Sequence, residues 1–78
     1  MPHVIVKLYP GRAEQQKREL AEEIARDVTA IIGCPESAVS VAFEEVAPAD
    51  WPEKVYRPDI LDKQHTLYKK PGYKNPFE

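Results

Sequence analysis

The sequence predicts an α/β fold: a single βαβ unit with parallel strands, followed by a short C-terminal helix. Three observations support it, namely a strand pattern at the start of the chain, a long helical pattern after it, and a second strand pattern beyond the helix. Because short loops join these segments, the strands should be parallel and the crossover right-handed. We expect the 78 residues to form one domain that spans residues 1–78.

The first strand is predicted over residues 3–9, where successive side chains point to opposite faces and β-branched residues dominate. A Pro-Gly pair ends it. From residue 13 to residue 32, apolar residues recur at helical spacing on one face, and charged residues cover the other. Gly33 supplies a C-terminal cap for this helix, and Pro35 prevents the helix from continuing.

A second strand is predicted over residues 38–46, where Val39, Val41 and Phe43 share one face. A turn-rich stretch follows at residues 48–52. Pro58 then suits the first turn of a short helix that runs to about residue 70. The apolar face of that helix would consist of Ile60, Leu61, Leu67 and Tyr68.

The predicted fold is incomplete without a partner subunit. Two strands and one long helix leave one face of the sheet uncovered, although the first strand carries apolar side chains on both faces. A chain this short buries only about 60% of the surface that its unfolded form exposes. Cys34 is the only cysteine, which excludes an internal disulfide. A homodimer that pools its strands is the simplest closed arrangement, with a hexamer as the open alternative.

Composition argues against several classes of ligand. The net charge is −2 and both signs are interspersed, whereas a nucleic-acid-binding protein normally carries a strong basic patch. His3 and His65 are too far apart for a metal-ligand motif, so we expect no metal and no cofactor. We expect no signal peptide, and no apolar run is long enough to span a bilayer. We therefore expect a cytoplasmic protein that binds neither nucleic acid nor membranes.

Pro2 is the candidate catalytic residue. Small residues after an initiator methionine favour its removal, which would leave Pro2 with a free secondary amine. An amine is mostly protonated at neutral pH and is then a poor base. An apolar pocket and a nearby cation both disfavour the ammonium form, and a base works best when its pKa lies near the operating pH.

Several motifs follow one another in a fixed order along the chain. The opening strand begins at Pro2, the pair Gly11-Arg12 precedes the long helix, and the second strand leads to Trp51. This ordered set resembles the 4-oxalocrotonate tautomerase family. The longer C-terminal part, with the run Lys69-Lys70-Pro71-Gly72-Tyr73, is similar to the bacterial phenylpyruvate tautomerase branch of that family.

The resemblance implies a keto-enol tautomerase, an isomerase that acts on small 2-oxo acids or their enols, such as phenylpyruvate. Pro2 would be the general base, taking a proton from the enol hydroxyl and returning one to carbon. Arg12 would grip the substrate carboxylate with its forked guanidinium, the alternative being a solvated arginine at a helix start. Trp51 would form an apolar wall near Pro2, a role compatible with an ordinary core or interface position.

Ser40 departs from the family pattern. Founding members of the family carry a second arginine at this position, which polarises the substrate carbonyl. A serine hydroxyl donates a hydrogen bond without a charge, so stabilisation of the developing enolate should be weaker. We therefore expect a monoacid with an aromatic or apolar tail as substrate. His3 is expected to be structural, because its side chain should face away from that of Pro2.

Two other functions stay open at this point. A non-catalytic, homo-oligomeric domain would bind a small acid through Arg12 and Trp51 without needing a free Pro2 amine. A related decarboxylase or dehalogenase would use the same amine for another reaction. Those reactions usually require an additional positively charged or water-activating group near the proline, and Ser40 supplies neither.

Overall fold

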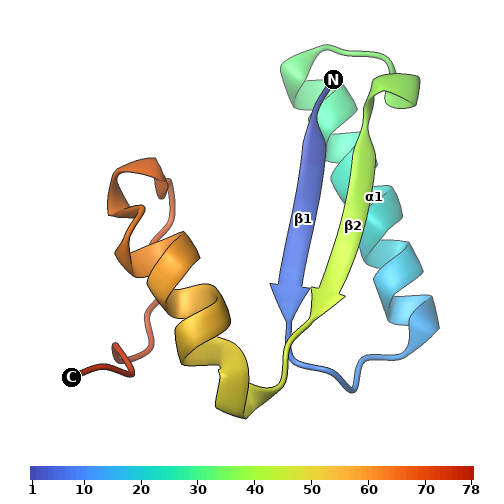
Figure 1. The fold of residues 1–78 in the computed structure, drawn as a ribbon. Coiled ribbons are helices and arrows are strands. Elements are labelled where there is room, and N and C mark those ends of the chain that lie inside the picture. Colours follow the sequence, from blue (N-terminus) through green and yellow to red (C-terminus); the bar gives the residue numbers. More distant parts are fainter. The chain divides into compact units, whose positions relative to one another are not determined.

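A computed structural model describes residues 1–78, which divide into two units, Met1–Glu45 and Val46–Glu78. The first unit consists of strand β1 (His3–Leu8), helix α1 (Glu14–Ile32) and strand β2 (Ser40–Glu45) (Figure 1). The strands pair in parallel, and their register sets His3 opposite Ser40 and Leu8 opposite Glu45. The predicted βαβ unit with parallel strands is confirmed.

Helix α1 closely follows the predicted range. It begins at Glu14, and the Gln16 side chain accepts a hydrogen bond at 3.0 Å from the N–H of the preceding Ala13. That bond satisfies a backbone donor that the helix itself leaves unpaired. Gly33 caps the other end with φ of 84°, a left-handed conformation that favours glycine, and its N–H donates to the Thr29 carbonyl at 3.1 Å.

Helix α1 packs on one face of the sheet, and the resulting core is small. The Lys17 ammonium lies 3.7 Å from the Glu45 carboxylate and ties the start of the helix to the end of β2. No side chain of this unit is fully buried. Of the apolar residues that recur along α1, three are exposed: Leu20 (43%), Ile31 (81%) and Ile32 (68%). The unit therefore leaves apolar surface uncovered.

The second unit corrects the predicted C-terminal helix. After a 3₁₀ turn at Pro48–Asp50 comes a π-helix, Pro52–Leu61, so the helix starts before Pro58 and ends well before residue 70. Pro52 occupies the first turn, where a missing N–H is tolerated. Pro58 lies inside the helix, where the carbonyl four residues back would clash with its ring in an α-helix. Here the hydrogen bonds span five residues instead, as from the Asp62 N–H to the Arg57 carbonyl at 2.9 Å.

The C-terminal segment packs onto this π-helix. Tyr56, which is buried with Val55, has its ring centre 5.8 Å from that of Tyr73 and 6.3 Å from that of Phe77. The Arg57 guanidinium lies 4.0 Å from the centre of the Phe77 ring, a cation–π contact. Tyr68, expected on an apolar helix face, is instead fully exposed after the 3₁₀ turn Gln64–Thr66.

No helix has both the length and the apolar character required to cross a membrane.

Candidate active site

Pro2 lies directly before β1, at the N-terminal end of the parallel sheet (Figure 1). Its carbonyl accepts a hydrogen bond at 3.1 Å from the N–H of Ser40, the first residue of β2. Proline cannot donate an N–H to the strand ladder, so it is tolerated at the start of a strand, where no such donor is required. Met1 is fully exposed, so its removal would free the Pro2 nitrogen without the loss of a packed side chain.

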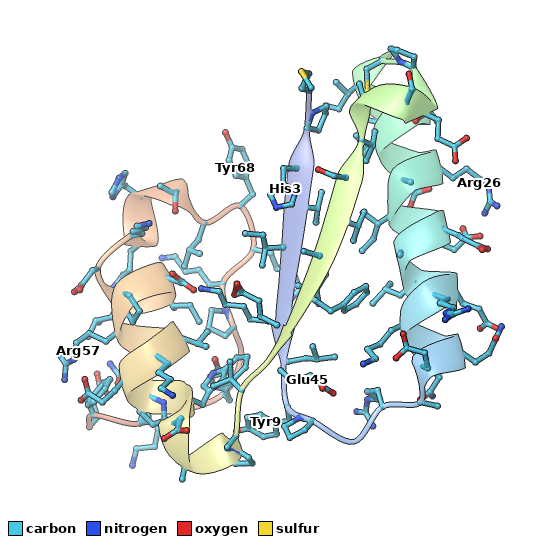
Figure 2. All side chains as sticks on the ribbon, turned by 45° about the vertical axis from the view of Figure 1, so that its right-hand side comes forward. His3, Tyr9, Arg26, Glu45, Arg57 and Tyr68 are labelled. Atoms are coloured by element: carbon cyan, nitrogen blue, oxygen red, sulfur yellow. The ribbon has the colours of Figure 1, made fainter.

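Ser40 and His3 form a hydrogen-bonded pair at this same end of the sheet. They are opposite one another in the register, and His3 Nδ1 lies 2.6 Å from Ser40 Oγ. Both residues are exposed, and Figure 2 shows the His3 ring standing on the sheet near the start of β1. This pair was missed at the level of sequence, because the alternation along one strand gives the direction of His3 relative to Pro2 but not the register between the strands.

A backbone hydrogen bond holds the Pro2 nitrogen close to the His3–Ser40 pair. Three covalent bonds and one hydrogen bond of 3.1 Å separate the Pro2 nitrogen from the Ser40 amide nitrogen, so these two atoms lie within about 7 Å of each other. One end of the sheet thus combines a potential base with a hydroxyl and an imidazole.

Arg12 belongs to the loop between β1 and α1, and Figure 1 shows this loop at the end of the sheet opposite to the N-terminus. The six residues of β1 separate Arg12 from Pro2, and at about 3.3 Å per residue this is roughly 20 Å. Arg12 is exposed and makes no ion pair within the chain. It borders a shallow hollow of about 220 Å³ between the sheet and α1, together with Leu8, Gln16, Lys17, Leu20 and Phe43. One chain therefore does not bring Arg12 to Pro2.

Trp51 belongs to the second unit, where it directly precedes the π-helix and is half-buried. Its indole Nε1–H donates a hydrogen bond at 3.1 Å to the hydroxyl of Tyr73, which fixes the ring against the C-terminal segment. Its expected place beside Pro2 stays a prediction. Within the chain, no group of three or more His, Cys, Asp or Glu side chains could hold a metal ion.

The chain is similar to known proteins in sequence and in fold. A family model described as tautomerase enzyme matches residues 2–53. The chain is 47% identical over 73 residues to a protein of Xylella fastidiosa (strain 9a5c) named "Probable tautomerase", covering 94% of this chain and 89% of that protein. This chain belongs to the tautomerase family. The resemblance drawn from the sequence is therefore confirmed, and the protein is an isomerase.

This tautomerase has further relatives of the same kind. It is 40% identical over 74 residues to tautomerase PptA of Pectobacterium carotovorum subsp. carotovorum (strain PC1), covering 94% of this chain and 97% of that protein. A solved structure of YwhB, a homologue of 4-oxalocrotonate tautomerase, superposes with a TM-score of 0.58 at 37% identity. That match covers 59% of this chain and 75% of the other.

Proposed function

We propose that this tautomerase interconverts the enol and keto forms of a 2-oxo acid, with the Pro2 amine as general base after Met1 is removed. The observation that carries the proposal is the hydrogen bond from the Ser40 N–H to the Pro2 carbonyl, which holds Pro2 at the end of the sheet beside the His3–Ser40 pair. The amine takes the proton of the enol hydroxyl and a proton returns to carbon, so the net reaction is an isomerisation. The Ser40 hydroxyl would donate to the substrate oxygen as negative charge develops there.

The substrate that we propose is a monocarboxylate with an aromatic tail, such as enol-phenylpyruvate. Arg12 makes no ion pair within the chain, so its guanidinium group is available to bind one substrate carboxylate through two hydrogen bonds. Lys17, the other cation beside the hollow, is already paired with Glu14 at 3.3 Å and Glu45 at 3.7 Å. A second cation at the position of Ser40 would favour a substrate with two carboxylates. The Ser40 hydroxyl is a neutral hydrogen-bond donor, so it does not provide this preference.

A homodimer would bring Arg12, which we propose binds the substrate carboxylate, close to Pro2 of the partner chain. Pro2 and Arg12 of one chain are roughly 20 Å apart, too far for one small acid to reach both. In a two-fold pairing of the sheets through their edges, the N-terminal end of one sheet lies beside the C-terminal end of the other. The partner's Arg12 would then approach Pro2. The two-stranded sheet has an unpaired edge on each strand, and such edges are ready to pair with a second chain.

We also propose that both units act as one functional domain over residues 1–78. The family match at residues 2–53 crosses the division between Glu45 and Val46 and includes Trp51. The hydrogen bond between Trp51 and Tyr73 gives the indole a defined orientation within its unit, as a pocket wall requires.

An assay of protein shown by intact mass to lack Met1 tests the proposed reaction. Enol-phenylpyruvate should be ketonised faster than a dicarboxylic dienol, as judged by kcat/KM. The same panel includes a 2-oxo acid that can lose carbon dioxide and a halogenated acrylate, which test the decarboxylase and dehalogenase alternatives. Full activity in protein that retains Met1 would overturn the role of Pro2, since its nitrogen is then an amide.

A further inference from the structure

We propose that His3 is a positioning residue for the reaction: its Nδ1–H donates a hydrogen bond to Ser40 Oγ and leaves the hydroxyl proton of Ser40 for the substrate oxygen. The inference rests on the proposed function, in which Pro2 removes the proton of the enol hydroxyl. It gives a role to a histidine that the sequence pattern alone marked as structural.

The geometry provides the contact, and the chemistry of serine decides its direction. His3 Nδ1 and Ser40 Oγ are 2.6 Å apart on directly opposed strand residues. A serine hydroxyl has one proton and two lone pairs. If Nδ1 accepts that proton, Ser40 presents only lone pairs, which repel an oxygen that is gaining negative charge. If Nδ1–H donates, the serine proton remains for the substrate.

A hydrogen bond donated by His3 Nδ1–H also makes the Ser40 hydroxyl a better donor. Hydrogen bonds in a chain polarise one another, so a donor bonded to Oγ strengthens the bond that the hydroxyl makes onward. The Ser40 N–H is bonded to the Pro2 carbonyl at 3.1 Å, so the pair is held in register with the amine. His3 thus compensates in part for the arginine that Ser40 replaces.

Other charged side chains farther along the same strands are engaged with each other. The Lys7 ammonium lies 4.0 Å from the Glu44 carboxylate, in a register pair farther along the strands from His3 and Ser40. The side chain within hydrogen-bond distance of the Ser40 hydroxyl is that of His3.

A double-mutant cycle in the Met1-free enzyme tests whether His3 acts through Ser40. We expect His3→Leu to lower kcat about tenfold, which corresponds to one ordinary hydrogen bond, with KM changed less than about twofold. Adding His3→Leu to Ser40→Ala should cause no further loss. His3→Asn should recover most of kcat, because its amide N–H can occupy the place of Nδ1–H. His65→Leu, at the other, exposed histidine, is the matched control and should leave kcat unchanged.

Nitrogen-15 NMR of the imidazoles reports the direction of the bond without any activity. We expect His3 to carry its neutral-form proton on Nδ1 in the wild type, and the proton to shift toward Nε2 in Ser40→Ala. An unprotonated Nδ1 in the wild type, or losses that multiply in the double variant, would overturn the inference while leaving Pro2 as the base. A Pro2→Ala variant with full activity would instead overturn the proposed function, so the two failures are distinguishable.

Discussion

At the scale of single residues, the proposed site depends on the backbone hydrogen bond from the Ser40 N–H to the Pro2 carbonyl and on the contact between His3 and Ser40 beside it. The sequence alone identifies Pro2 as a candidate, because removal of Met1 would expose its amine, and Ser40 as another, because it departs from a family pattern. The hydrogen bond between the Ser40 N–H and the Pro2 carbonyl depends on strand register. A predicted strand over residues 38–46 does not define that register, because strand limits are uncertain by a few residues. The His3–Ser40 contact could not be predicted for the same reason.

Replacement of Pro2 by alanine tests the base directly. Pro2→Ala leaves a primary amine in place of a secondary one after Met1 is removed, so the rate should fall by about ten- to a hundredfold, part of what a general base supplies. Circular dichroism should show an unchanged fold, because the backbone carbonyl at this position can still accept the bond from Ser40. A variant with wild-type kcat/KM would exclude the proposed mechanism.

The same amine predicts a definite pH dependence. It acts as a base only when it has no proton, so kcat/KM should rise with pH and level off once the amine is deprotonated. The apparent titration describes the site as a whole, because interacting groups titrate together. Protein with a chemically blocked amino terminus is the control, and its residual rate should lack this rise. A flat profile in the unblocked enzyme would count against an amine base.

At the scale of elements, local signals decided what could be predicted. Helix α1 was predictable to within one residue because its apolar period and its Gly33 cap are both local features of the sequence. The Pro52–Leu61 helix was misplaced because both prolines fit a first turn, and nothing local identifies a five-residue hydrogen-bond ladder. The packing of Tyr73 and Phe77 onto Tyr56 comes from contacts distant in sequence.

The bond between Trp51 and Tyr73 should stabilise the second unit measurably. Tyr73→Phe removes the hydroxyl that accepts the indole N–H at 3.1 Å and keeps the ring that packs on Tyr56. We expect the free energy of unfolding to fall by about 1 kcal/mol in a denaturant titration followed by tryptophan fluorescence. Tyr68→Phe, at a fully exposed tyrosine, is the matched control and should change nothing. Equal midpoints for the two variants would contradict the assigned bond.

At the scale of the whole molecule, a single chain lacks a substantial core, and it holds Pro2 and Arg12 at opposite ends of its sheet. Val55 and Tyr56 are its only buried hydrophobic residues, and apolar side chains such as Ile31 remain exposed on α1. The uncovered sheet face predicts a partner subunit, and this stays a prediction. The separation of Pro2 from Arg12 by β1 was not foreseen, although the crossover topology already implied it, since a helix that joins parallel strands starts at the end opposite to Pro2.

A site shared between subunits predicts complementation between two inactive variants. Light scattering should first show a dimer, and a hexamer would refute that assembly. Pro2→Ala and Arg12→Ala are then mixed in equal amounts, unfolded and refolded together, and assayed at substrate concentrations below KM. In a mixed dimer, Pro2 of one chain meets the partner's Arg12, so one of its two sites is intact. Because random pairing makes about half of the dimers mixed, about a quarter of the wild-type activity should return. Each variant refolded alone is the control and should stay at its own low rate. If Pro2 and Arg12 of the same chain formed the site, every site in the mixture would carry one substitution and no activity would be recovered.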